Sequence, residues 1–226
     1  MMKTTTDPGV GTSQAVRIAA GDVLLDGELI IPPGASGLVL FAHGSGSSRH
    51  SPRNRAVAEV IRNSQIGTLL FDLLTEEEAR VDEVTGTQRF DISFLAKRLV
   101  AATRWVARQP EAQHLSLGYF GSSTGAAAAL VAAAELRDVI EAVVSRGGRP
   151  DLAGEALSDV DAPTLLMVGE RDELVIALNT TALRRLHTDK ELVIIPNATH
   201  LFEEHGALAQ VARLAADWFR AHLHPR

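Results

Sequence analysis

The chain has 226 residues, which suits one sizeable α/β domain that can bury a core without disulfides or metals. It contains no cysteine, which excludes a thiol nucleophile and thiolate metal sites, and the fold needs no oxidising compartment. Its formal net charge of −6 argues against a general nucleic-acid binder, which would present a basic face.

The N-terminal residues 1–14 are mostly polar and small, and we expect them to form a flexible tail. A single domain is predicted over residues 15–226. The tail lacks the apolar core of a signal peptide, and no apolar run is long enough to span a membrane. The expected setting is therefore the cytoplasm, without a membrane partner, while the sequence leaves the oligomeric state open.

Short apolar runs alternate with amphipathic segments along the chain. Residues 23–31 predict a hairpin with Asp26-Gly27 as its turn. Buried strands are predicted over residues 38–42, 66–70, 115–120, 139–144, 164–168 and 192–195. Helices are predicted over residues 53–62, 92–107, 126–136, 174–186 and 207–222, and the acidic run at 76–78 indicates a solvated face or a helix start. This alternation predicts an α/β fold with a mostly parallel central sheet and helices on both faces.

The sharpest motif, Gly121-Ser122-Ser123-Thr124-Gly125, lies where the strand at 115–120 turns into a helix. A serine at such a corner has its hydroxyl pushed out of the fold. The corner needs glycines because its backbone conformations obstruct side chains. Ser123 is therefore the candidate nucleophile, whereas Ser122 lies one place early and is expected to be structural.

Two partners for this serine follow later strands, at the edge of the sheet where sites gather. Asp172 follows the strand at 164–168, and His200 follows the strand at 192–195. The chain order Ser, Asp, His is that of α/β-hydrolases. A histidine can take the serine proton, and a carboxylate orients the imidazole and stabilises its cation. Glu170 stays open as an alternative acid.

Other titratable residues fit these two roles less well. His205 lies further from its strand end than the candidate base, and Asp72 ends a different strand, where a displaced acid is a minor alternative. Asp159 and Asp161 precede their strand, as His114 does, so all three are expected at the opposite edge of the sheet.

An oxyanion hole is predicted from the backbone N–H groups of Thr124 and of Ser45, which lies in the loop at 43–48. His43 is expected to shape this loop by hydrogen bonding. The Gly-x-Gly of the loop is not a dinucleotide fingerprint, because Arg49 stands where the third glycine should be. No cluster has a familiar metal-ligand spacing, so neither a cofactor nor a metal is expected.

Arg49 and Arg146 are candidate substrate contacts, because guanidinium groups suit anionic ligands. For Arg146 we favour a structural role, in which it holds loops together through carboxylates. The sequence assigns no role to His50.

Four segments, residues 41–54, 121–125, 145–151 and 199–202, resemble the α/β-hydrolase superfamily and within it the dienelactone hydrolase-like proteins. The resemblance runs from about Val16 to the C-terminus. It implies an α/β-hydrolase fold and a cofactor-free Ser-His-Asp hydrolase, carried onto Ser123, His200 and Asp172. Dienelactone hydrolases proper have cysteine at the nucleophile position, so Ser123 favours ordinary carboxylic esters. Similar sequences are sometimes joined to a phosphoribosyltransferase domain, for which this chain has no room.

Many members of the superfamily insert a helical lid after the strand matching residues 139–144. The connection to the next strand is short here, so we expect no separate lid domain and an open site for small, soluble esters. The expected function is a serine carboxylesterase that acts on a small-molecule ester through an acyl-enzyme. The alternatives are the same triad acting on thioester, amide, lactone or organophosphate substrates, and a non-catalytic binding module with this fold.

Overall fold

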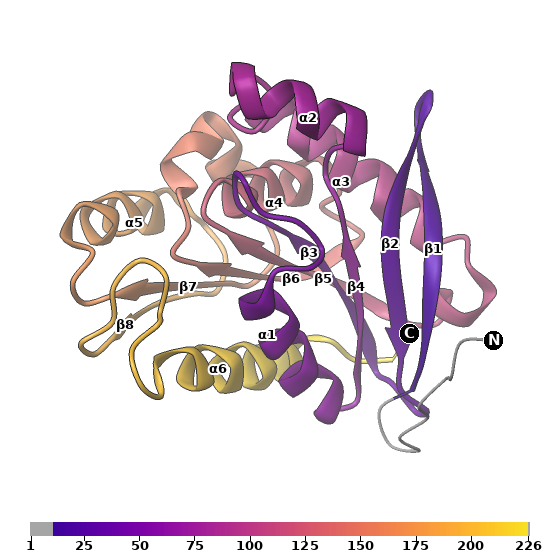
Figure 1. The fold of residues 1–226 in the computed structure, drawn as a ribbon. Coiled ribbons are helices and arrows are strands. Elements are labelled where there is room, and N and C mark those ends of the chain that lie inside the picture. The colour runs from indigo at the N-terminus through magenta and orange to yellow at the C-terminus, as the bar shows by residue number, and fades with distance from the viewer. Residues whose placement is uncertain (1–10, 226) are drawn as a thin grey trace.

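The computed structural model describes residues 11–225. Within them, eight strands form one sheet in the order β1-β2-β4-β3-β5-β6-β7-β8, as Figure 1 shows. The strands are β1 (Thr12–Ala20), β2 (Val23–Ile31), β3 (Gly37–Ala42), β4 (Ile66–Phe71), β5 (Ser116–Ser122), β6 (Ile140–Arg146), β7 (Thr164–Gly169) and β8 (Lys190–Ile195). From β4 to β8 along this order every pairing is parallel, whereas β1 and β2 pair antiparallel at one end.

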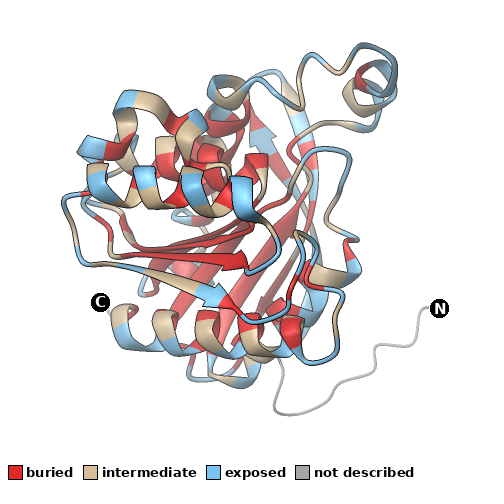
Figure 2. Cartoon of the chain, turned by 90° about the vertical axis from the view of Figure 1, so that its left-hand side faces the viewer, coloured by how far each residue is buried: buried red, intermediate tan, exposed pale blue. Residues whose placement is uncertain are grey.

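Helices cover both faces of the sheet, as predicted. They are α1 (Pro52–Asn63), α2 (Glu76–Thr85), α3 (Ile92–Val106), α4 (Thr124–Glu135), α5 (Glu173–Arg185) and α6 (Ala207–His222), with short 3₁₀ segments η1 (Pro110–Ala112) and η2 (Pro150–Asp159). Neighbouring strand residues enter different layers: Tyr119 packs into the core beneath α3 and α4, and Phe120 into the core beneath α1 and α6. Figure 2 shows the buried strands between helices whose outer faces are exposed.

The predicted hairpin within residues 23–31 is wrong. β2 runs straight through Asp26-Gly27, and the turn lies at Gly21-Asp22, between β1 and β2. Gly21 has φ +68°, which a turn needs, whereas a Cβ on Gly27 would lie 3.1 Å from the Cβ of Phe71. Gly27 in the strand therefore allows close packing against Phe71, whereas Gly21 at the turn allows a positive φ.

The boundary of the predicted tail also changes. Residues 1–10 lie outside the described residues, but Thr12 to Gln14 belong to β1, because they pair with Ile31 to Leu29 of β2. These residues form a strand through backbone hydrogen bonds to β2, although their polar side chains do not show the pattern of a strand.

No separate lid interrupts the described chain between β6 and β7, as expected. The connection is η2, which packs against α4 and α5. The acidic run at 76–78 begins a full helix, α2, which Figure 1 shows standing beyond the sheet. Thr75 and Glu78 form a capping box at its start. No helix in residues 11–225 has the length and apolar character needed to cross a bilayer.

Candidate active site

Ser123 lies at the corner between β5 and α4, in a backbone conformation that L-residues rarely adopt. Its φ is +51° and its ψ is −121°. Added Cβ atoms would lie 2.4 Å from the Ala126 Cα at Gly121 and 2.2 Å from the Ala42 oxygen at Gly125. Both glycines are therefore required by close backbone approach, and the corner holds Ser123 at the carboxyl end of β5.

His200 and Asp172 lie together at the ends of neighbouring strands. The Nδ1 atom of His200 is 2.6 Å from the Oδ2 atom of Asp172. A donor at Nδ1 leaves Nε2 of the neutral ring as an acceptor, which is the tautomer a general base requires. Asp172 is the residue before α5, and its side chain makes no capping hydrogen bond to that helix, so its carboxylate is available to His200.

The alternative acids and base are placed elsewhere. Glu170 accepts a hydrogen bond from the backbone N–H of Asn197 at 2.7 Å, and Asp72 pairs with Arg49. His205 is exposed and makes no hydrogen bond or ion pair with other residues in the described range. Among these rivals, none contacts the imidazole of His200.

Ser123 and His200 both line a cavity of about 260 Å³, although no hydrogen bond joins them in the described chain; we call it the polar cavity. Two arginines, Arg53 and Arg146, share it. Its lining residues are Gly44, Ser45, Ser47, Ser51, Arg53, Asn54, Ser122, Ser123, Arg146, His200 and Leu201. Ser122 is buried and donates to Oδ1 of Asn54 at 3.1 Å, so it joins β5 to α1.

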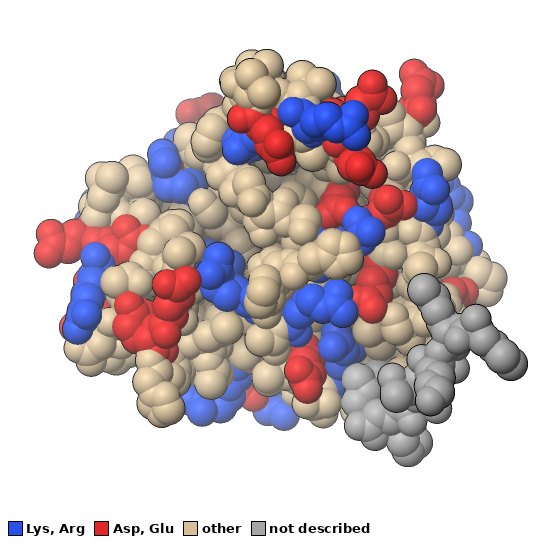
Figure 3. All heavy atoms as spheres, viewed as in Figure 1, with Lys and Arg blue, Asp and Glu red and all other residues tan. Residues whose placement is uncertain are grey.

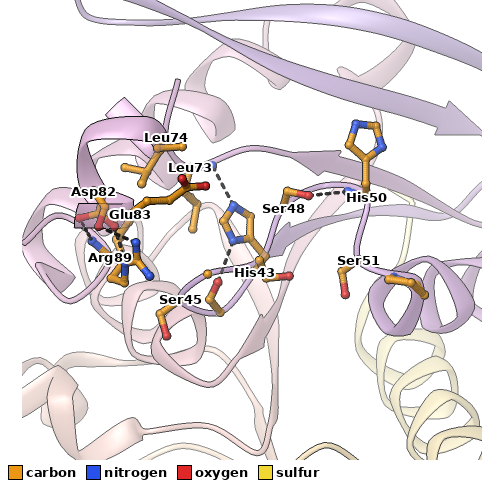
Figure 4. A pocket seen from close by; sticks show the side chains of 16 residues that line it. His43, Ser45, Ser48, His50, Ser51, Leu73, Leu74, Asp82, Glu83 and Arg89 are labelled. Carbon is orange, nitrogen blue, oxygen red and sulfur yellow. Dashed lines mark hydrogen bonds and ion pairs between the residues drawn. The ribbon is translucent and has the colours of Figure 1, made fainter. Parts of the chain in front are cut away.

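His43 supports the loop that carries Ser45. Its Nε2 accepts from the backbone N–H of Leu73 at 3.1 Å, and its Nδ1 then donates to the Gly44 carbonyl at 3.0 Å (Figure 4). Burial lowers the pKa of His43, against smaller raising effects of the Gly44 carbonyl and of Asp72. A neutral His43 therefore ties the loop to the segment after β4.

The two predicted oxyanion donors differ in the structure. The N–H of Thr124 belongs to the first turn of α4, where amides lack intrahelical partners. The N–H of Ser45 instead donates to the Thr124 hydroxyl at 3.0 Å. An oxyanion can use the Ser45 donor only by displacing or sharing that hydroxyl, which the sequence motif did not reveal.

A second and larger cavity, of about 580 Å³, lies between this loop and α2; we call it the α2 cavity. Leu73, Leu74 and Leu95 give it apolar walls, and Asp82 pairs with Arg89 at its far side (Figure 4). Gly44, Ser45, Ser47 and Ser51 line both cavities, so the loop separates them. Sequence reasoning did not find this cavity, because it indicated at most a helix start at 76–78 and not where the helix lies.

The two arginines predicted as substrate contacts have different surroundings. The backbone and guanidinium of Arg49 both bind Asp72, and Arg49 does not line the polar cavity. Arg146 does line it, and its side chain contacts no carboxylate among residues 11–225, so the favoured carboxylate-pairing role is wrong. His50 lines the α2 cavity, and its backbone N–H donates to the Ser48 hydroxyl at 3.2 Å.

Comparison with known proteins gives matches along most of the chain. A Mycobacterium tuberculosis protein, provisionally named a phosphoribosyl transferase, is 55% identical over 210 residues. That match covers 93% of this chain but 46% of the relative, so the chain spans about half the length of this curated relative.

Two solved structures illustrate the range of structural similarity. A dienelactone hydrolase from Anabaena variabilis is 59% identical, with a TM-score of 0.94, over 95% of this chain and 100% of that one. The esterase domain of a Rhodothermus marinus protein shares the fold at 19% identity, with a TM-score of 0.72 over 93% and 99% of the two chains.

The model of the dienelactone hydrolase family matches residues 61–223, which include the elbow at residues 121–125, Asp172 and His200. With the fold and the Anabaena variabilis structure, this match shows that the chain has the α/β-hydrolase fold and belongs to the dienelactone hydrolase family.

Proposed function

We propose that this protein is a serine hydrolase that cleaves small carboxylic esters through an acyl-enzyme. Ser123 is the nucleophile, His200 the general base and acid, and Asp172 the residue that orients His200. The 2.6 Å contact between His200 Nδ1 and Asp172 Oδ2, beside a cavity shared with the strained Ser123, carries the proposal. Family membership supports hydrolysis as the reaction class.

The proposed reaction begins when His200 Nε2 takes the proton of the Ser123 hydroxyl. The Oγ atom then attacks the ester carbonyl carbon, and the carbonyl oxygen becomes an oxyanion. The imidazolium, stabilised by Asp172, returns the proton to the leaving alkoxide as the C–O bond breaks. Water, activated by the same imidazole, hydrolyses the acyl-Ser123 ester and restores the free enzyme.

The backbone N–H of Thr124 and that of Ser45 would bind the oxyanion in this scheme. One such donor typically contributes about 10²–10³ in rate. Because Ser45 donates to the Thr124 hydroxyl before substrate arrives, the substrate oxygen has to compete for that hydrogen bond.

A fluorophosphonate probe tests the assignment, because it reacts covalently with an activated serine. We expect labelling of the wild type and none of Ser123→Ala. Ser122→Ala is the matched control and should remain labelled, since Ser122 points to Asn54. Absence of labelling in the folded wild type would favour the non-catalytic binding module instead.

The substrate range is tested with p-nitrophenyl esters of increasing acyl length. We expect short acyl chains to be preferred, because no separate lid covers the site in the described chain. A preference for long acyl chains would contradict this part of the proposal.

A further inference from the structure

Arg146 is a buried cation without a counter-charge. It ends β6, beside Ser122 of β5, and the residue is 8% exposed. The Nη1 atom is buried and has no hydrogen-bond partner, and the side chain forms no ion pair within residues 11–225. Burial, together with the positive charge of Arg53, lowers the pKa of Arg146 to about 10.

Most other buried or half-buried arginines among the described residues form ion pairs; Arg62, which is half-buried, instead donates to the Thr68 hydroxyl at 3.1 Å. Arg89 binds Asp82, Arg98 binds Glu78, and Arg49 binds Asp72. A charge buried without a partner is costly, because it loses its hydration and gains no compensating attraction. Arg146 differs from Arg62 because it is buried rather than half-buried and lines a cavity, which indicates that its counter-charge comes from a ligand.

The polar cavity provides the place for that ligand. Arg146 lines it together with Ser123 and His200, and no carboxylate is present among its lining residues. Arg53 adds a second cation; its Nη1 lies 3.1 Å from Glu203, while its Nε is buried without a partner. The start of α1, capped by Ser51, also faces the cavity and favours an anion there.

The surrounding surface does not supply such a preference by itself. Acidic and basic side chains are interspersed over the face shown in Figure 3, and the formal net charge is −6. The electrostatic field of this surface would not steer anions to the site. Selectivity for an anionic substrate would therefore have to come from the polar cavity.

We propose that Arg146 binds a carboxylate or phosphate group carried by the ester substrate, away from the carbonyl that Ser123 attacks. This inference rests on the proposed function of Ser123. A cavity of about 260 Å³ has room for only a short anionic arm of the substrate, so the anionic group lies a few bonds from the scissile ester. A guanidinium matches the paired oxygens of both groups.

Matched substrates separate this role from general catalysis. Ethyl hydrogen succinate carries a carboxylate on its acyl group, and ethyl 4-methylpentanoate replaces that carboxylate with a neutral branch of the same shape. We expect wild type to prefer the succinate by about tenfold or more in kcat/KM, chiefly through KM. Acetoxyethyl phosphate, with the anion on the alcohol side, tells whether phosphate and that orientation are accepted.

Replacement of Arg146 should reduce this preference. In Arg146→Met we expect the ratio of kcat/KM for the anionic over the neutral ester to fall by about 10–100-fold, and in Arg146→Lys by less. Arg104→Gln removes an exposed arginine that pairs with Glu135 on α4, and should leave the ratio unchanged. A ratio unchanged in Arg146→Met, or no preference in wild type, would overturn the proposal.

Succinate binding keeps this test separate from the fate of the esterase proposal. Calorimetric titration of succinate into Ser123→Ala needs no turnover. We expect binding that is lost in Ser123→Ala combined with Arg146→Met and kept when Arg104→Gln is combined instead. If Ser123 does not react with the probe but Arg146→Met abolishes succinate binding, the anion subsite stands while the esterase proposal fails. If Arg146→Met leaves succinate binding unchanged, the subsite proposal is overturned.

Discussion

The two cavities that meet at the loop carrying Ser45 differ in how their charges are matched. The polar cavity has two arginines and no carboxylate in its lining. The α2 cavity is lined by Leu73, Leu74 and Leu95 and by two carboxylates, of which buried Asp82 pairs with Arg89 whereas exposed Glu83 forms no ion pair within residues 11–225. The polar cavity therefore favours an anionic group, whereas the leucines of the α2 cavity favour an apolar one, so a substrate with two different ends would bind in a defined orientation.

The largest expected effect is a loss of kcat when Asp172, the partner of His200 at the polar cavity, is replaced. Asp172→Asn should lower kcat by roughly 10³–10⁴, because the amide no longer stabilises the imidazolium and favours the wrong tautomer. Ester hydrolysis measured at saturating substrate, with probe labelling as a second readout, checks it.

Glu170→Gln is the matched control for that change, since Glu170 lies two residues away and accepts from the Asn197 N–H. It should keep nearly full activity. A large loss in Glu170→Gln alone would transfer the role of the acid to Glu170.

The next effect concerns the wall of the α2 cavity. Asp82 accepts from the backbone N–H groups of Gln88 and Arg89 and from Arg89 Nε at 2.5 Å. Burial acts to raise the pKa of Asp82, but the hydrogen bonds outweigh it and hold that pKa below its usual value. Asp82→Asn should destabilise α2 by about 2 kcal/mol, because it weakens charge-assisted hydrogen bonds.

Hydrogen exchange of residues 76–89 measures this local loss, and thermal unfolding measures the global one. Glu83→Gln, on the same helix, is the control. Unchanged exchange in Asp82→Asn would show that the ion pair does not hold α2 in place.

A smaller effect is expected on acyl-chain preference when the α2 cavity is partly filled. Ala79 lies on α2 and lines the α2 cavity but not the polar one. Ala79→Phe should fill part of that space and lower kcat/KM for a p-nitrophenyl octanoate by about tenfold, while p-nitrophenyl acetate is little affected. Equal effects on both esters would show that the acyl group does not enter the α2 cavity.

The smallest effect is on the pH dependence of stability. It concerns His43, which supports the loop that carries Ser45. Because its pKa is lower in the folded state than in the unfolded chain, protons bind preferentially to the unfolded chain. Stability should fall as the pH drops below about 6.5, with a slope of at most about 1.4 kcal/mol per pH unit from this residue.

Urea unfolding at several pH values between 7 and 5 checks this slope in wild type and in His43→Gln, whose amide oxygen can still accept from Leu73. The slope should be shallower in His43→Gln. Identical slopes would show that His43 does not contribute to the acid sensitivity of the fold.

Much of the fold could be predicted because hydrophobic periodicity reports burial directly. The runs that form β3, β4, β5 and β7 are buried along their whole length, and the structure places them near the predicted positions. The elbow was predictable because close packing at Gly121 and Gly125 leaves a short local pattern.

The remaining features depend on contacts between distant segments. Asp26-Gly27 has the composition of a turn, but Gly27 is set by the neighbouring Phe71. The hydrogen bond from Ser45 to Thr124 joins residues 79 positions apart. The missing partner of Arg146 is likewise visible only after the surrounding chain is placed, because an arginine in a sequence carries no sign of whether it is paired.

The conformation of Ser123 also bears on how this chain would change under selection. A φ of +51° suits glycine better than serine, so Ser123→Gly is expected to fold at least as stably as the wild type while lacking the nucleophile. Mutation screened only for folding or expression would therefore drift toward an inert chain at this corner. Libraries made for thermal robustness need an activity screen alongside, since a substitution that relieves backbone strain here also removes the proposed nucleophile.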